Sequence, residues 1–274
     1  MDIIAEIGKS KLYTFHSHTQ FCDGHAPMET MARAAVSEGF THYGFSPHSP
    51  VPIASPCNMK AEDTDAYLAE VERIKGLFGD RCRFYAGMEI DYLGPEWGPA
   101  HPYFREQPLD FRIGSVHFIP TQDGVPTDID GHFERFSERV QADFHGDIDY
   151  VVDTFFGQSL AMVEAGGFDI IGHLDKVGLN ASLYAPGIEG SSFYQSRLNR
   201  LLDAVAEAGV IVELNTKAFE EHGRMFPAAA SLRKLMERGT KVIVNSDAHR
   251  PERVNASRLQ GLAMVEKIKG SLGR

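Results

Sequence analysis

Two histidines with one residue between them, His16 and His18, are the first side chains in the sequence whose spacing could serve chemistry. They follow residues 11–14, which are rich in strand-forming types, and alternate residues of a strand point to the same side. Asp23 comes five residues after His18, and Gly24 beside it would let the chain turn back toward the histidines. Two imidazoles and a carboxylate at a strand end predict the start of a metal site, provided that other segments supply further ligands.

Polar residues also stand at the ends of the other predicted strands. Short runs with many β-branched and aromatic residues predict strands at 41–46, 83–90, 111–119, 168–174, 210–215 and 240–246. In chain order, the polar residues at the ends of these strands are His48, Glu89, His117, His173, Glu213, Asn215, Asp247 and His249. In a parallel barrel the carboxyl ends of the strands form the face on which active sites are built, so we expect these side chains to converge.

Stretches with helical periodicity separate nearly all of these strands. We expect helices at residues 28–39, 62–78, 132–141, 150–165, 192–208, 228–238 and about 256–268. Strands that alternate with helices are typical of a parallel sheet wound by crossover helices. Taking residues 1–274 as one domain, we predict an α/β fold, a distorted TIM-like (β/α)7 barrel, with a doubly wound open sheet as the alternative. The segment 93–108, rich in proline, is expected to be a long loop over the site.

The composition excludes some classes of function. Of the 274 residues, 43% are hydrophobic and 24% are charged, as in an ordinary soluble globular protein. The net charge of −11 argues against a nucleic-acid partner, but it permits a small anionic substrate, because bound divalent ions can reverse the local field. The three cysteines fit no disulfide framework, and neither a signal peptide nor a membrane-spanning stretch is evident, so we expect a cytoplasmic protein. Cys22 could be a thiolate ligand, although a small buried side chain is the favoured interpretation. The sequence leaves the oligomeric state open.

Several short motifs carry a resemblance to a known family. They are His16-Ser17-His18 with Cys22-Asp23-Gly24-His25, Gly87-Met88-Glu89-Ile90-Asp91-Tyr92, Gly114-Ser115-Val116-His117, Gly172-His173-Leu174-Asp175 and Asn245-Ser246-Asp247-Ala248-His249. In type and order these motifs resemble the polymerase and histidinol phosphatase (PHP) superfamily, and within it the stand-alone histidinol-phosphate phosphatases. The resemblance covers about residues 13–249. Pro47 departs from it, because many members have Asp or Glu before the histidine that corresponds to His48.

The resemblance implies a barrel with seven strands and a site for three divalent ions, which could be zinc, manganese or iron. The implied ligands of one ion are His16, His18, Glu89 and Asp247. Glu89 would bridge to a second ion, held by His117 and His173. The implied ligands of the third ion are Asp23, His48 and His249. Glu89, His117 and Asp247 are the predicted catalytic residues.

The implied reaction is hydrolysis of a phosphomonoester, in which a water between two ions loses its proton and attacks phosphorus in line. Arginines outside the ligand set could clamp the phosphate, and the candidates are Arg197, Arg224 and Arg250. Glu213 and Asn215 could bind a substrate amine or the outer nitrogen of a ligand histidine.

Three functions remain open at this point. The favoured one is a histidinol-phosphate phosphatase of histidine biosynthesis, which would convert L-histidinol phosphate to L-histidinol and phosphate. The second is a phosphoesterase of the same superfamily that acts on another small phosphomonoester, such as a nucleotide or sugar phosphate. The third is a metal-binding module without turnover. The acidic net charge disfavours a nuclease that acts on DNA ends.

Overall fold

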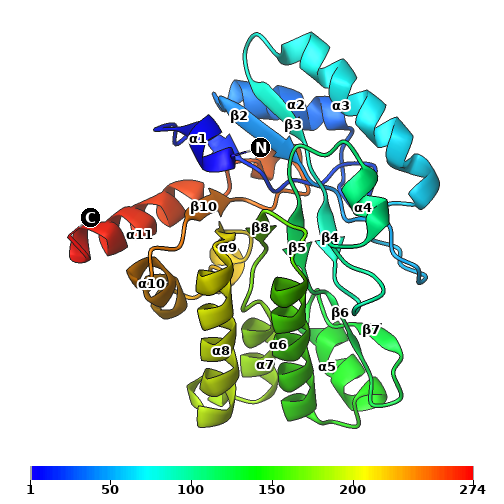
Figure 1. The fold of residues 1–274 in the computed structure, drawn as a ribbon, viewed down its shortest axis with the longest axis vertical. Helices are drawn as coiled ribbons and strands as arrows, with labels where there is room; N and C mark the ends of the chain where they lie inside the picture. The colour runs from blue at the N-terminus through cyan, green and yellow to red at the C-terminus, as the bar shows by residue number, and fades with distance from the viewer. Residues whose placement is uncertain (1, 274) are drawn as a thin grey trace.

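Short parallel strands in two sheets form the centre of the molecule (Figure 1), which a computed structural model describes from residue 2 to residue 273. The strands are β1 (Tyr13–Thr14), β2 (His42–Phe45), β3 (Arg83–Ala86), β4 (Glu89–Asp91), β5 (Ile113–Ser115), β8 (Ile170–Ile171), β9 (Ile211–Asn215) and β10 (Val242–Asn245). One sheet has the order β1-β2-β3 and the other the order β10-β9-β8-β5-β4. Every pairing within these two sheets is parallel.

The two sheets join at both edges, which closes a distorted barrel. β3 and β4 belong to one chain segment that kinks at Gly87, where an added Cβ would lie 2.2 Å from the Phe111 ring. At the other edge Ser17 and Ala248 form a parallel bridge, and the amide of His18 donates to the Ala248 carbonyl at 2.8 Å. With β3 and β4 taken as one kinked strand, seven parallel strands surround the core, and the predicted seven-stranded barrel is confirmed.

Helices on the outside connect successive strands, as the alternating pattern predicts. They are α2 (Met28–Ser37), α3 (Thr64–Phe78), α5 (Phe133–Asp143), α6 (Ile148–Ala165), α8 (Ser192–Ala208), α10 (Ala229–Glu237) and α11 (Arg258–Ser271). In Figure 1, α2 and α3 pack near the top against β2 and β3, while α5, α6 and α8 lie together in the lower half. Among the described helices, none has the length and apolar character that crossing a membrane requires.

Several shorter elements were not predicted. They are α1 (Ile3–Ile7), α4 (Pro102–Glu106), α7 (Val177–Tyr184), α9 (Phe219–His222), the antiparallel pair β6 (Phe118–Pro120) and β7 (Pro126–Asp128), and the 3-10 turns η1 (Ala61–Asp63), η2 (Ile188–Gly190) and η3 (Pro251–Arg253). Because α1 buries Ile3 and Ile7 against Phe15 and Ile113, it closes the amino-terminal end of the barrel. The carboxyl end of the barrel remains accessible.

The segment 93–108 does not cover that open end, so this prediction was wrong. It contains α4, and the Trp97 ring lies 4.5 Å from the His101 ring and 5.4 Å from the Phe104 ring, between centroids. Phe104 is fully buried in a cluster with Tyr67 of α3. The prolines suggest a loop, but the aromatic side chains form a core of their own on the flank of the barrel.

Candidate metal centre

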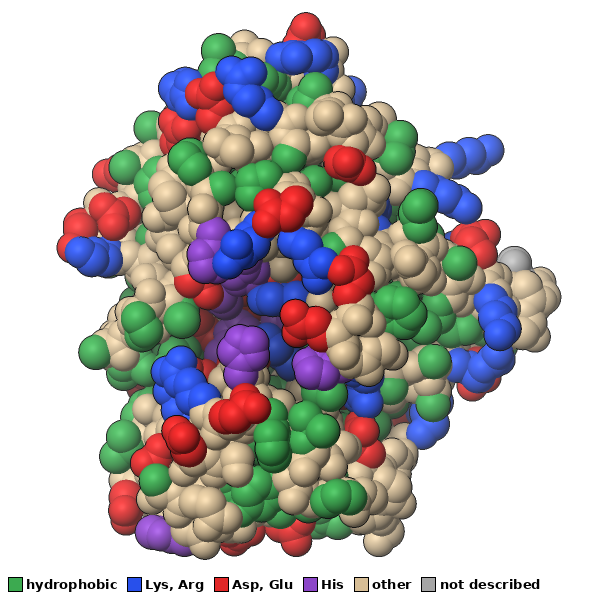
Figure 2. Space-filling model, turned by 180° about the vertical axis from the view of Figure 1, so that it is seen from behind, with side chains coloured by type: hydrophobic (Ala, Val, Ile, Leu, Met, Phe, Trp, Pro, Cys, Tyr) green, Lys and Arg blue, Asp and Glu red, His purple; other side chains and the backbone are tan. Residues whose placement is uncertain are grey.

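A cavity of about 820 Å³ opens at the carboxyl ends of the strands. Figure 2 shows it as a hollow with histidine side chains inside and with basic and acidic side chains around it. Besides the strand ends, its walls come from the segments 128–135, 176–183 and 215–222, and no described residue of the segment 93–108 takes part. This is the end of a parallel barrel at which enzymes of this architecture carry their active sites.

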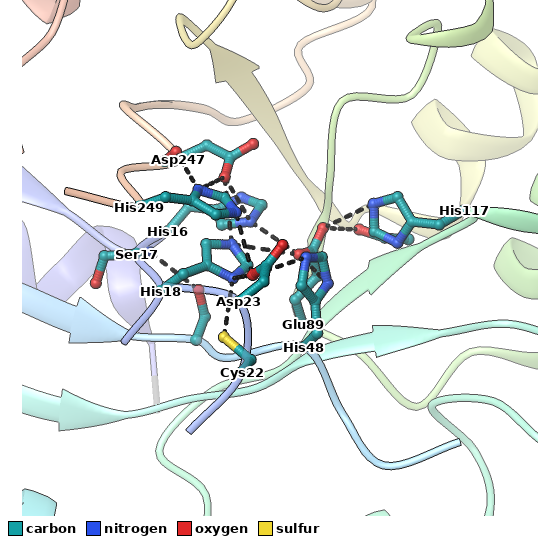
Figure 3. A network of polar contacts seen from close by, with 12 residues as sticks. His16, Ser17, His18, Cys22, Asp23, His48, Glu89, His117, Asp247 and His249 are labelled. Carbon is teal, nitrogen blue, oxygen red and sulfur yellow. Dashed lines mark hydrogen bonds and ion pairs between the residues drawn. The ribbon is translucent and has the colours of Figure 1, made fainter. Parts of the chain in front are cut away.

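The first ligand group surrounds the ends of β1 and β10. Nε2 of His16 lies 3.1 Å from Oε2 of Glu89, and Nε2 of His18 lies 3.2 Å from Oδ1 of Asp247. Nε2 of His16 is also 3.7 Å from the same Asp247 oxygen. All four side chains are buried, and Figure 3 shows them turned toward one another. The structure therefore brings together the four residues that the resemblance assigns to one ion.

The second group shares Glu89 with the first. Oε1 of Glu89 lies 2.9 Å from Nε2 of His173 and 3.4 Å from Nε2 of His117. These two histidine nitrogens are 3.3 Å apart. Because one Glu89 oxygen faces His16 and the other faces His117 and His173, this carboxylate has the placement that a bridging ligand needs.

The third group lies nearer the opening of the cavity. Oδ1 of Asp23 is 3.4 Å from Nε2 of His249, and 3.7 Å from both Nε2 of His48 and Nδ1 of His18. Pro47 does not displace His48, because a parallel bridge joins His48 to Glu89 and the Pro47 carbonyl accepts from the Glu89 amide at 3.0 Å. His48 thus stays in the group even though the acidic residue common in the family is missing.

These side chains fit divalent ions. Among residues 2–273, Nε2 of His16, Nε2 of His18 and Oδ1 of Asp23 are buried, and none of their close contacts has the geometry of a hydrogen bond. A buried polar atom without a partner raises the free energy of the folded state, and a cation shared with its neighbours would remove that cost. Mixed imidazole and carboxylate ligands suit zinc, manganese and iron.

The electrostatics of the cluster keep its carboxylates ionised. Burial raises the pKa of Glu89, but the charges of His16, His117 and His48 outweigh it and hold that pKa well below its usual range. Burial also lowers the pKa of His18, and the neighbouring His249 and His48 lower it further. Metal ions bind ionised carboxylates and neutral imidazoles, so ions that bind here would displace the proton from any histidine that is charged in their absence.

Comparison with known proteins decides the family. The PHP domain family model matches residues 14–217, which is more than half of the chain. The chain belongs to the PHP domain family. The resemblance inferred from its motifs is therefore confirmed, and Asp247 and His249, which complete two of the ligand groups, lie beyond the matched residues.

Two named relatives align along most of this PHP protein. A Deinococcus radiodurans protein named "Probable histidinol-phosphatase" is 29% identical over 269 residues, which cover 93% of each chain. A Schizosaccharomyces pombe protein with the same name is 26% identical over 257 residues, which cover 87% of this chain and 81% of the relative.

Two solved structures share the PHP fold seen here. One is a Listeria monocytogenes protein assigned as a histidinol phosphatase, with a TM-score of 0.81 and 20% identity over 90% of this chain and 99% of that chain. The other is histidinol phosphate phosphatase from Lactococcus lactis, solved with zinc, L-histidinol and phosphate. Its TM-score is 0.74, with 20% identity over 94% of each chain.

Glu213 lies behind the metal centre of the PHP domain and not in its cavity. Its Oε1 accepts from Nδ1 of His16 at 2.7 Å, and its Oε2 accepts from the His173 amide at 3.0 Å. Asn215 donates both to Glu213 and to Oδ2 of Asp247, at 3.1 and 3.0 Å. Of the two roles that the sequence left open for Glu213, the structure supports contact with the outer nitrogen of a ligand histidine, because full burial keeps this side chain from a substrate amine.

Asp91 has a similar position behind His117, and the sequence analysis missed it. Its Oδ1 accepts from Nδ1 of His117 at 2.7 Å, and its Oδ2 accepts from the Asn58 amide at 2.9 Å. Because Asp91 stands two residues after Glu89 in β4, alternation along the strand was the signal that could have revealed it. Cys22 lies nearby with Sγ 3.4 Å from Nδ1 of His18, and burial raises the pKa of its thiol to about 12, which favours the neutral thiol over a thiolate ligand.

The predicted phosphate clamp needs correction for two of its three arginines. Arg224 is held by Glu189, with Nη2–Oε1 and Nη1–Oε2 distances of 2.8 and 3.1 Å, and it does not line the cavity. Arg197 of α8 pairs with Asp153 of α6 at 2.5 Å and does not line the cavity either. Both guanidinium groups already have carboxylate partners outside the site. Arg250 does line the cavity and remains a candidate for phosphate binding.

Proposed function

We propose that this protein is a metal-dependent phosphomonoesterase that hydrolyses L-histidinol phosphate to L-histidinol and phosphate. The observation that carries the proposal is the convergence of Glu89 with eight other imidazole and carboxylate side chains, at and beneath the wall of one cavity. The names of the two aligned relatives support histidinol phosphate as the substrate. The shared fold of the Lactococcus lactis enzyme, which holds L-histidinol and phosphate, supports it further.

We also propose that the centre holds three ions of zinc, manganese or iron. His16, His18, Glu89 and Asp247 would hold the first, Glu89, His117 and His173 the second, and Asp23, His48 and His249 the third. Bound divalent ions supply positive charge to the phosphoryl oxygens and acidify a water molecule for in-line attack. The three ligand carboxylates neutralise part of that charge, and the surplus suits a phosphate dianion.

The side chains of this chain have distinct tasks in the proposed reaction. Glu89 holds both inner ligand groups at a fixed separation, because its two oxygens face different histidines. Asp91 and Glu213 keep a proton on Nδ1 of His117 and His16, since a carboxylate only accepts, and this leaves each Nε2 free as a ligand. Arg250, on the cavity wall, is proposed to contact the substrate. Asn215 is proposed to hold Glu213 and Asp247 in place through its side-chain amide.

We propose that the whole chain, residues 1–274, acts as one phosphoesterase domain in the cytoplasm, within histidine biosynthesis. Support for a single domain comes from Asp247 and His249, which lie close to the C-terminal end but join ligand groups begun at His18 and Asp23. Support for the cytoplasm comes from the three cysteines, which are all free thiols. The net charge of −11 favours a small phosphoester over nucleic acid as the substrate.

A substrate screen tests this function. Protein loaded with zinc or manganese would be assayed against L-histidinol phosphate, nucleoside monophosphates and sugar phosphates, with kcat/KM as the readout. We expect L-histidinol phosphate to exceed every other ester by at least about a hundredfold, because a polar site discriminates strongly between substrates. A preference for another ester would refute the assigned substrate. If the loaded protein hydrolysed no ester, a metal-binding module without turnover would be the remaining function.

A further inference from the structure

Five positively charged side chains line the cavity, and they are not equivalent: Arg135, Lys176, Lys217, Arg250 and Arg253. Three of them are paired with carboxylates outside the ligand groups. Arg135 lies 3.5 Å from Asp128, Lys176 lies 2.6 Å from Asp130, and Arg253 pairs with Glu220. Lys217 differs from these three, because its ion-pair partner is a candidate metal ligand.

The ammonium of Lys217 contacts one atom of the first ligand group and one atom of the third. Its Nζ is 3.4 Å from Oδ1 of Asp247 and 3.3 Å from Nε2 of His249. Oδ1 of Asp247 is the atom that faces His16 and His18, and Nε2 of His249 is the atom that faces Asp23. The ammonium therefore shares its contacts with atoms that the proposed function assigns to ions.

The backbone fixes the base of this side chain while its end can move. The Lys217 amide donates to Oδ1 of Asn215 at 3.0 Å, directly after β9, and the neighbouring Thr216 hydroxyl donates to the Ala256 carbonyl at 2.7 Å. The side chain itself is 43% exposed, and Asp247 is its single ion-pair partner within residues 2–273. The lysine side chain is a flexible stem of four carbons, so the ammonium can move away from the ligand atoms and into the cavity.

Divalent ions at Asp247 and at His249 would repel the ammonium from these atoms, because the ions and the ammonium all carry positive charge. The turn after β9 keeps the ammonium at the cavity wall, where an anionic group bound to the centre would be its new partner. We propose that Lys217 is a phosphate-binding residue, whose ammonium donates to the phosphoryl oxygens of the bound phosphomonoester. This inference rests on the proposed function, and it replaces Arg224 and Arg197 by a lysine that the sequence analysis did not consider.

Phosphate binding to the zinc-loaded protein tests the inference without turnover. Calorimetry would give the dissociation constant of inorganic phosphate for the unaltered protein and for Lys217→Met, Lys217→Arg and Lys241→Met. Lys241, exposed directly before β10, is the matched control, because its loss changes the net charge equally. We expect Lys217→Met to weaken phosphate binding at least about tenfold, which is the scale for losing a hydrogen bond to a charged group. Lys217→Arg should retain most of the affinity, and Lys241→Met all of it.

Two further readouts separate the alternatives. Zinc content should be the same in Lys217→Met as in the unaltered protein, and so should the melting temperature, because a half-exposed side chain leaves no cavity in the core. Unchanged phosphate affinity in Lys217→Met would overturn the inference, and so would a loss of zinc, which would make Lys217 a residue that positions a ligand. Hydrolysis of L-histidinol phosphate by the unaltered protein is scored separately, so that the proposed substrate can fail while the role of Lys217 stands, or the reverse.

Discussion

Nδ1 of His16 donates to Oε1 of Glu213 at 2.7 Å, between two fully buried side chains that are 197 residues apart in the chain. Glu213 also accepts from the Asn245 amide at 3.0 Å, so its two oxygens hold four donors in all. This carboxylate fixes the orientation of one candidate ligand, His16, and the backbone of another, His173. Such outer partners raise the affinity of a metal site by orienting the residues that bind the ion.

Replacing Glu213 by glutamine should weaken metal binding. In Glu213→Gln one oxygen becomes an amide nitrogen, which cannot accept from His16 or from the His173 amide. We expect zinc affinity, measured by competition with a chelating dye, to fall about tenfold to a hundredfold. The control is Glu207→Gln, an exposed position on α8. Equal zinc affinity in both variants would show that Glu213 does not orient the ligands.

Replacing Glu89 by glutamine should nearly abolish turnover. The change keeps the size of the side chain but removes the charge that faces both inner ligand groups. We expect kcat to fall at least about a hundredfold, which is the scale for losing one preorganised electrostatic group. The test uses L-histidinol phosphate with saturating zinc or manganese. Turnover within a few-fold of the unaltered protein would remove Glu89 from the reaction.

The Arg224→Ala variant separates a structural arginine from a phosphate clamp. Arg224 is the cation closest to Asp175, at 3.5 Å, and burial raises the pKa of that carboxyl to about 6 even with the arginine present. Without Arg224, the buried Asp175 loses its compensating charge. We expect the free energy of unfolding to fall by about 1–3 kcal/mol in urea denaturation, while KM for L-histidinol phosphate stays the same. Arg200→Ala, an exposed change on α8, is the control for stability.

A raised KM in Arg224→Ala with undiminished stability would restore the clamp that the sequence suggested. The double variant Arg224→Ala with Asp175→Asn gives a second check. If the loss of stability comes from the unpaired carboxylate, the neutral amide should recover part of it.

Removing metal should destabilise the fold. The ligand cluster places three buried or half-buried carboxylates close together, and bound ions add stability that grows with the logarithm of the free ion concentration relative to the dissociation constant. We expect a chelator to lower the melting temperature by several degrees, and added zinc or manganese to restore it. A melting temperature that does not respond to chelation would mean that the cluster binds no ion tightly.

The convergence of most candidate ligands could be predicted from the sequence because of a property of the barrel itself. His16, Glu89, His173 and Asp247 stand at the ends of different strands, and parallel strands in a closed barrel bring these ends together. Asp91 was accessible to the same argument, since it follows Glu89 by two residues on one face of β4. Alternation along a strand can therefore reveal a residue, such as Asp91, that holds a ligand histidine from behind.

Loop side chains could not be predicted in the same way. Arg224 turns to Glu189, which lies 35 residues earlier, and no local pattern in the sequence reports that pairing. Lys217 contacts Asp247 and His249, which are also far from it in the sequence. The helix α1 escaped prediction because five residues are too few for helical periodicity to show.

Metal stoichiometry tests the central claim most directly. The protein would be saturated with zinc or with manganese, freed of excess ion and analysed for ions per chain, with Glu89→Gln measured beside it. The three ligand groups predict about three divalent ions per chain in the unaltered protein, and fewer in Glu89→Gln, because this residue joins two of the groups. At most one ion per chain in the unaltered protein, under saturating metal, would contradict the account.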